Sequence, residues 1–194
     1  MRAKIMKMFV LTVFTIVGLI VYAENNLLPV QVEAPVETNH VNLDPKQTYC
    51  LAQNIFFEAG NQSLEGMAAV ADVTINRVES SRYPNNICDV VKQGLKHPSG
   101  NMKRNKCQFS WYCDGKSDDI PVDSLHMGIN EAWKNSQHIA SSMLIEYNLR
   151  KTNWLGITEG STHYHAHYVV PDWIDDAGMK RIRQIGSHIF YKFW

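Results

Sequence analysis

The run from Pro45 to Gly60 has apolar residues at helical spacing, and a carboxylate lies on the same stripe. Asp44 is a suitable N-cap for this helix, Pro45 suits its first position, and Gly60 supplies a stop signal. Glu58 follows Ile55 by three residues, so the periodicity predicts that its side chain points toward the core. The sequence therefore predicts a helix that brings an acid to the edge of a hydrophobic interior.

This environment is expected to raise the pKa of Glu58. Burial beside Phe56 and Phe57 disfavours the carboxylate, and the negative end of the helix dipole acts in the same direction. Such a carboxyl can hold a proton near neutral pH and deliver it to a leaving group. Two simpler interpretations are a surface Glu that ends a helix and a buried Glu paired with Arg77.

The rest of the chain predicts an α+β fold that is mainly α-helical. Further helices are expected from about Ser63 to Val78, with small residues that allow close packing, and from about Asp123 to Tyr147. The segment 83–121 has Pro, Gly or Asn every few residues and is predicted to be looped. Strands at 161–169 and 184–193, separated by a turn region, predict a C-terminal β-hairpin.

The N-terminal segment has the features of a signal peptide. Residues 1–23 combine three basic residues, an apolar stretch of fifteen residues from Met8 to Tyr22, and small or permitted residues before a cleavage site after Ala23. We expect export to the periplasm, cell wall or extracellular space without stable membrane association after cleavage; an uncleaved anchor is the alternative. Residues 24–44 are predicted to be a linker, and 45–194 one catalytic domain.

The four cysteines agree with export, because an even number in an oxidising compartment usually forms disulfides. Three pairings are possible, and we favour Cys107 with Cys113 as a local clamp, which leaves Cys50 with Cys88. The absence of a Cys-x-x-Cys pair disfavours a zinc site made by the four. The chain has 19 basic and 19 acidic residues, so no electrostatic footprint for nucleic acid is present.

Five blocks of sequence resemble the spore cortex-lytic (SleB-like) family of cell-wall hydrolases. In order, they are CLAQNIFFEAGNQSLEGMAAVADVTINRV, RYPNNICDVV, CQFSWYCDGKSD, STHYHAHYVVPDWI and IGSHIFYKFW, and together they span 50–194. The resemblance implies a lysozyme-like, lytic transglycosylase-like fold, peptidoglycan as the substrate, and Glu58 as the catalytic acid. One position differs: the family often has Arg after the Glu-Ala pair, where this chain has Gly60.

Candidate substrate-binding residues lie in two of these blocks. Gln108, Ser110 and Trp111 lie between two cysteines and combine amide, hydroxyl and aromatic groups, which suit hydrogen bonding to acetamido groups and stacking on sugar rings. The resemblance makes Tyr164 and His165 candidates for the groove wall. Packing is the simpler role for Phe109.

A zinc site is the main competing interpretation. His163, His165 and His167 alternate, so in a strand all three project from one face and could hold the metal of a peptidoglycan amidase or peptidase. However, no Glu accompanies a His pair at helical spacing as in zinc peptidases. We therefore expect no metal and no other cofactor. Structural roles are predicted for Glu65, Asn76, Arg77 and His188.

The carboxylates favour a mechanism with a single acid. Glycoside hydrolysis normally requires two carboxylates, and none of the other candidates has a buried pattern like that of Glu58: Asp72, Asp89, Asp114, Asp118 and Asp119. A single acid suffices for lytic transglycosylation, which leaves a 1,6-anhydro end. The alternatives are a hydrolytic muramidase and an inactive cell-wall-binding module. The sequence leaves the biological role and the oligomeric state open.

Overall fold

The computed structural model describes residues 41–122 and 127–194 of the chain. The predicted signal peptide and residues 24–40 of the predicted linker lie outside the described residues, so these predictions stay untested. Within the described part of the chain, no helix is long and apolar enough to cross a membrane.

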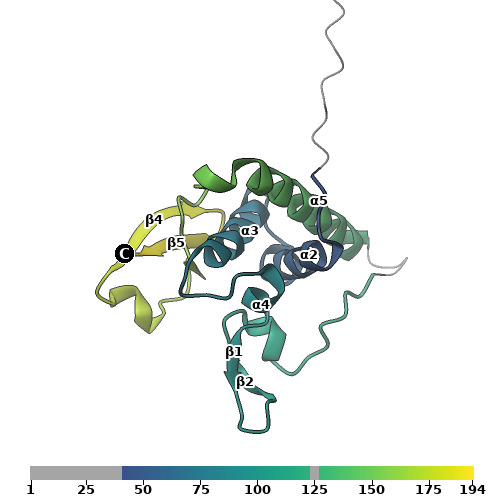
Figure 1. Ribbon diagram of the computed structural model, residues 1–194. Helices are drawn as coiled ribbons and strands as arrows, with labels where there is room; N and C mark the ends of the chain where they lie inside the picture. Colours follow the sequence, from purple (N-terminus) through teal and green to yellow (C-terminus); the bar gives the residue numbers. More distant parts are fainter. Residues whose placement is uncertain (1–40, 123–126) are drawn as a thin grey trace, which may run out of the picture. The chain divides into compact units, whose positions relative to one another are not determined.

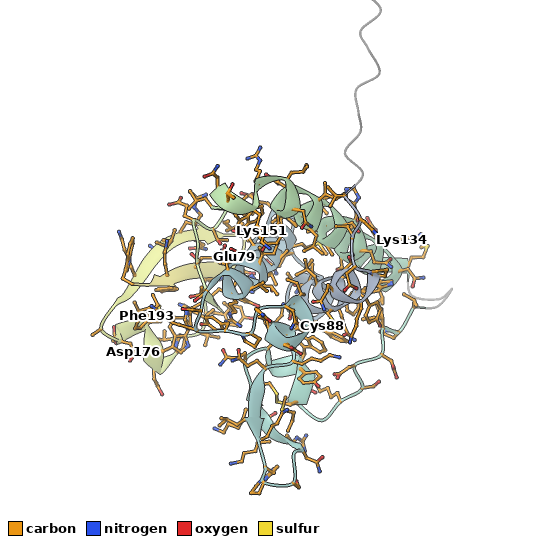
Figure 2. All side chains as sticks on the ribbon, viewed as in Figure 1. Glu79, Cys88, Lys134, Lys151, Asp176 and Phe193 are labelled. Atoms are coloured by element: carbon orange, nitrogen blue, oxygen red, sulfur yellow. A yellow bond between two sulfur atoms is a disulfide. The ribbon has the colours of Figure 1, made fainter. Side chains whose placement is uncertain are left out.

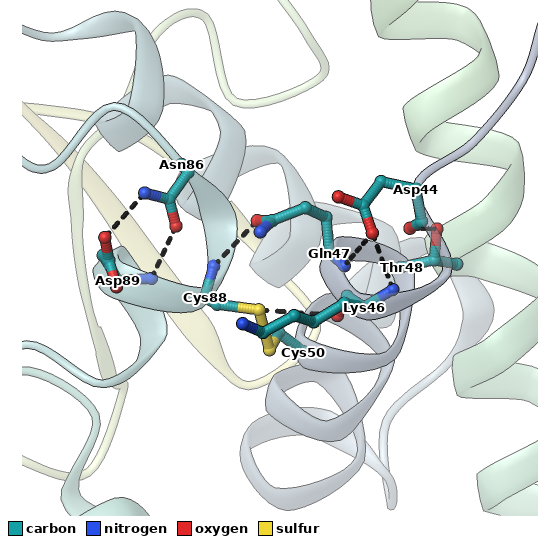
Figure 3. The surroundings of a disulfide bond; sticks show 8 residues. All are labelled: Asp44, Lys46, Gln47, Thr48, Cys50, Asn86, Cys88 and Asp89. Atoms are coloured by element: carbon teal, nitrogen blue, oxygen red, sulfur yellow. Dashed lines mark hydrogen bonds between the residues drawn. A yellow bond between two sulfur atoms is a disulfide. The ribbon is translucent and has the colours of Figure 1, made fainter.

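The first described helix, α2 (Pro45–Ala59), begins and ends where the sequence predicts. One carboxylate oxygen of Asp44 accepts hydrogen bonds from the backbone N–H groups of Lys46 (2.8 Å) and Gln47 (3.3 Å), as Figure 3 shows. These bonds satisfy donors that have no partner within the helix. Local signals are therefore sufficient to start this helix.

Two longer helices complete the helical core. Helix α3 (Leu64–Glu79) is capped by Ser63, whose hydroxyl accepts from the backbone N–H of Gly66 (3.2 Å). Helix α5 (Met127–Arg150) lies across both α2 and α3 (Figure 1). It ends three residues later than predicted, and the predicted start at Asp123 lies outside the described residues. The three helices bury one apolar cluster that includes fully buried Leu51, Ile55 and Ile75.

The segment predicted to be looped contains short regular elements instead. These are α4 (Ile87–Val91), β1 (Gly94–Lys96), β2 (Met102–Cys107) and the 3-10 helix η1 (Ser110–Cys113). Strands β1 and β2 pair antiparallel as a hairpin. Elements of three to six residues are too short to show a hydrophobic periodicity. The prediction for this segment therefore depended on its frequent Pro, Gly and Asn residues, which favour loops.

Both disulfides that the sequence favoured are present. Cys50–Cys88 joins α2 to α4, where the backbone N–H of Cys88 also donates to the side chain of Gln47 (3.0 Å; Figure 3). Cys107–Cys113 joins the end of β2 to η1. The described cysteines are all paired.

The C-terminal region forms a three-stranded antiparallel sheet, not a two-stranded hairpin. Its strands β3 (His163–Ala166), β4 (Met179–Ile185) and β5 (His188–Phe193) have the order β3-β5-β4. The strand predicted at 184–193 is wrong in its bounds, because the chain turns at Gly186, whose φ is +55°. Two further 3-10 helices precede β3 and β4: η2 (Lys151–Asn153) and η3 (Asp172–Asp175).

The sheet is attached to the helical core through a second apolar cluster. Phe190 of β5 and Ile185 of β4 pack against Ala69 and Val73 of α3. Because Phe190 is fully buried, this contact fixes the sheet on one side of α3. The α+β, mainly helical class predicted from the sequence is confirmed.

Candidate functional site

Glu58 lies in the last turn of α2, with its side chain partly buried. The hydroxyl of Tyr164, on β3, donates a hydrogen bond to its Oε2 atom (2.9 Å). Burial raises the pKa of Glu58, while the Tyr164 hydrogen bond and the positive charge of Arg77 lower it to a smaller extent. The raised pKa expected from the sequence is therefore confirmed, with desolvation as its main cause.

Arg77 is a buried cation behind this acid. Its Nε donates to the backbone carbonyl of Thr162 (2.8 Å), and its guanidinium lies over the ring of Phe109 (4.8 Å to the centroid). Burial lowers the pKa of Arg77, and the charge of Glu58 partly opposes that effect. The cation thus fixes the segment before β3, as a structural role requires, and also influences the acid.

Asn76 and Asp72 of α3 hold the loop that leads into β3. The Asn76 amide donates to the carbonyl of Ser161 (3.0 Å). One oxygen of Asp72 accepts from both the backbone N–H (2.7 Å) and the hydroxyl (2.6 Å) of Thr158. Asp72 is fully buried, which corrects the expectation that only Glu58 is an inward carboxyl. Its burial raises its pKa, but its contacts are with the loop.

A cavity of about 570 Å³ opens beside Glu58. One part of its wall is apolar and comes from α2 and α5, whereas another is polar and comes from the turns after α2 and β4. Its lining residues are Phe56, Phe57, Glu58, Gly60, Asn61, Gln62, Gly128, Ile129, Ala132, Tyr168, Ser187 and His188. Of these, only Glu58 is a carboxylic acid, within the part of the chain that the structure describes.

The polar wall is ordered by its own hydrogen bonds. The Gln62 side-chain oxygen accepts from the hydroxyl of Ser187 (2.6 Å), which ties the turn after α2 to the β4–β5 turn. His188 is 8% exposed and contacts the Tyr164 ring edge to face, with 5.1 Å between centroids. Burial lowers the pKa of His188, which favours the neutral ring. Tyr168 is 78% exposed and offers an accessible aromatic face.

Not all of the predicted substrate-binding residues lie at the cavity beside Glu58. Tyr164 contacts the acid directly. Gln108 and Ser110 are exposed but do not line the cavity, and neither does His165, whose Nε2 is hydrogen-bonded to the hydroxyl of Tyr191 (3.0 Å). These positions do not support a single groove that includes all the predicted residues.

Trp111 has a packing role, which corrects the expectation that its ring is available for stacking on sugar. It is 8% exposed and stacks on Phe57 with 4.6 Å between centroids. Its indole N–H donates to Asn54 (2.9 Å). Because Phe57 lines the cavity, Trp111 supports the wall from behind. Phe109 is buried, as predicted.

The alternating histidines are engaged by neighbouring groups. His163 and His165 share a face and both contact Trp173, whereas His167 follows the end of β3 and lies by the carbonyl of Ser187 (3.1 Å). Among the described residues, no group of three or more His, Cys, Asp or Glu side chains is arranged to hold a metal ion.

Sequence reasoning did not identify several of the cavity residues, among them Gln62, Tyr168 and His188. Gln62 and Tyr168 look like ordinary loop residues, and His188 was expected to be structural. The only local signal was their inclusion in the family-like blocks. Gln62, Tyr168 and His188 lie at one cavity because the C-terminal sheet packs beside the end of α2.

Comparisons with known proteins agree with this architecture. A family model described as "Cell Wall Hydrolase" matches residues 61–191, a range that begins just after Glu58. The catalytic domain of the germination-specific lytic transglycosylase SleB from Bacillus anthracis is similar in fold, with a TM-score of 0.52 and 19% identity over 78% of this chain and 98% of that one. This supports the lysozyme-like, lytic transglycosylase-like fold.

The catalytic domain of the Bacillus cereus SleB protein also matches, with a TM-score of 0.49 and 22% identity over 82% of this chain and 100% of that one. No curated protein matches the chain.

Proposed function

The chain belongs to the cell wall hydrolase family, and on this premise we propose that it cleaves peptidoglycan glycan strands between N-acetylmuramic acid and N-acetylglucosamine as a lytic transglycosylase. The observation that carries this proposal is Glu58, an acid of raised pKa on the wall of a cavity. A cavity of about 570 Å³ is within the range of small-molecule sites and can take part of a sugar chain.

In the first step, protonated Glu58 donates its proton to the glycosidic oxygen, and the bond from C1 of N-acetylmuramic acid to that oxygen breaks. The substrate's own acetamido group stabilises the cation at C1. The Tyr164 hydroxyl donates to the carboxylate that has just formed, in the geometry already present (2.9 Å). Hydrogen bonds to a charged group are stronger than those between neutral groups, so Tyr164 helps to hold the acid in place for both steps.

In the second step, the Glu58 carboxylate removes the proton of the C6 hydroxyl as that oxygen attacks C1. The bond between C1 and O6 closes the 1,6-anhydro ring, and Glu58 regains its proton. No water and no cofactor are consumed. Gln62, Ser187 and His188 provide polar groups along the cavity, and Tyr168 provides an exposed ring for a sugar face.

The arrangement of carboxylates favours this route over hydrolysis. An inverting hydrolase requires a second carboxylate across the cavity to activate water, and a retaining enzyme requires one as the nucleophile. Asp72 is bound to the loop at Thr158, and no Asp lines the cavity among the described residues. Glu58 therefore has both acid and base roles in our proposal.

Glu58→Gln tests the assignment, because the amide has nearly the same shape but cannot transfer the proton. We expect a loss of wall-cleaving activity of about a hundredfold to ten-thousandfold. Glu65→Gln is the matched control, since Glu65 is exposed in the first turn of α3 and outside the cavity. Near-parental activity of folded Glu58→Gln protein would overturn the assignment.

The products test the reaction type. Mass spectrometry of digested peptidoglycan should show ends one water lighter than muramidase products, and borohydride should fail to reduce them. Reducible ends would identify a hydrolytic muramidase, and free stem peptides an amidase. Peptidoglycan as substrate agrees with the predicted signal peptide and the two disulfides, and we infer that the protein acts outside the cytoplasm.

A further inference from the structure

The β1–β2 hairpin concentrates positive charge in a chain that is neutral as a whole. It includes Lys96, Lys103, Arg104 and Lys106, together with His97. No Asp or Glu occurs between positions 90 and 113, although acidic and basic residues are equal in number over the chain, at 19 each. The hairpin is therefore a local region of positive potential.

The charges are available to a partner. Lys96, Arg104 and Lys106 are exposed and Lys103 is half-buried. The ion pairs found between described residues involve none of them. Figure 1 shows the hairpin extending away from α2, α3 and α5, and its main packing contact outside itself is with η1. The fold of the core does not require these cations.

The base of the hairpin is held in place. The Cys107–Cys113 disulfide ties the end of β2 to η1, and the Arg104 Nε donates to the backbone carbonyl of Asp114 (3.0 Å). Trp111 of η1 in turn stacks on Phe57, which lines the cavity beside Glu58. A continuous set of contacts thus connects the hairpin to the wall of the site.

We propose that the β1–β2 hairpin binds the free carboxylates of peptidoglycan stem peptides and so holds the enzyme on its polymeric substrate. This proposal rests on the proposed function, which places a peptide-bearing glycan in the cavity. Lysine is a flexible point charge with three donors, which suits carboxylates on mobile peptides. Each exposed contact is weak, but several on one polymer act together. Binding should therefore depend strongly on salt.

The test is a pelleting assay with isolated sacculi at low salt, in the Glu58→Gln background so that no cleavage occurs. Replacing Lys96, Lys103 and Lys106 by Gln should raise the Kd about tenfold, given weak but cumulative contacts. The control carries the same charge change on other elements, at Lys134, Lys151 and Lys180. Figure 2 shows Lys134 and Lys151 away from the hairpin. The Kd of this control variant should stay within about twofold of the parent value.

Binding to chemically treated sacculi identifies the groups that the hairpin contacts. Converting the peptide carboxylates to amides should reduce parental binding to the level of the hairpin variant. Removing phosphodiester polymers with hydrofluoric acid should leave the difference between parent and hairpin variant unchanged. If that difference survives amidation, or disappears after hydrofluoric acid treatment, stem-peptide carboxylates are not the partner. Equal binding by the hairpin and control variants would also overturn the proposal.

Failure of this proposal is distinguishable from failure of the proposed function. With Glu58 intact, the hairpin variant should cleave short peptide-free glycan strands at the parental rate, because the hairpin does not line the cavity. A parent enzyme that binds sacculi through the hairpin but releases no anhydro ends would contradict the proposed function alone. A strong loss of cleavage of peptide-free strands in the hairpin variant would show that the hairpin acts on catalysis, and would contradict the docking role.

Discussion

Tyr164→Phe removes the hydroxyl that donates to Oε2 of Glu58 (2.9 Å) and leaves the ring in place. That hydrogen bond lowers the pKa of Glu58 against the larger effect of burial. Without it, the carboxylate is less stable and the pKa of Glu58 rises further. Since the enzyme requires protonated Glu58 to begin the reaction, the variant should stay active to higher pH.

The magnitude follows from the energy of a hydrogen bond to a charged group, about 1.5 to 3 kcal/mol. At about 1.4 kcal/mol per pKa unit, complete loss would raise the pKa by about one to two units. Because Glu58 borders an open cavity, water can replace part of the lost hydrogen bond. We therefore expect the pKa of Glu58 to rise by about one unit in the variant.

The assay is kcat/KM against pH with peptide-free glycan strands, whose alkaline limb reports the essential acid of the free enzyme. Tyr191→Phe is the matched control: it lies on the neighbouring strand β5 and loses a hydrogen bond to His165, not to Glu58. Its alkaline limb should coincide with that of the parent. An alkaline limb of Tyr164→Phe that is unchanged, or moved to lower pH, would refute this account of the acid.

Three further predictions concern stability. Gly156→Ala should destabilise the fold by about 3 kcal/mol or more in urea unfolding, because Gly156 has a φ of +63° and a Cβ there would overlap the buried Asp72 carboxylate. Replacing Cys50 and Cys88 by Ala should cost about 4 kcal/mol, since this disulfide closes a loop with a sequence separation of 38. Burial and two nearby arginines lower the pKa of His163 to about 4. The unfolded chain therefore binds more protons between about pH 6.5 and 4, and acidification through this range should destabilise the parent more than His163→Gln.

Each of these three stability predictions has a control and an outcome that would contradict it. Gly128→Ala, where a Cβ meets nothing within 4 Å, should leave stability nearly unchanged, and equal unfolding midpoints for the two glycine variants would contradict the steric explanation. Removing the Cys107–Cys113 disulfide, with a separation of 6, should cost only about 2 kcal/mol; a larger loss there than at Cys50–Cys88 would contradict the loop-entropy estimate. Parallel acid destabilisation of parent and His163→Gln would show that His163 is not responsible.

The sequence by itself determined the features whose causes are local. The bounds of α2 and the start of α3 follow from caps within three residues and from a stripe over a few turns. The same stripe placed Glu58 at the edge of the core and gave the direction of its pKa. These predictions succeeded because helix formation and side-chain direction depend on neighbours in the chain.

Tertiary structure decided what depends on contacts between distant residues. Tyr164 donates a hydrogen bond to Glu58, although the two residues are 106 positions apart in the sequence. Trp111 is a core residue because it stacks on Phe57 and donates a hydrogen bond to Asn54. The sequence shows that a tyrosine, a tryptophan or a histidine is present, but side chains of these types serve equally in a core, a groove or a metal site. Only the packing of the sheet on α3 selects among these roles, because it fixes which groups are desolvated together around the acid.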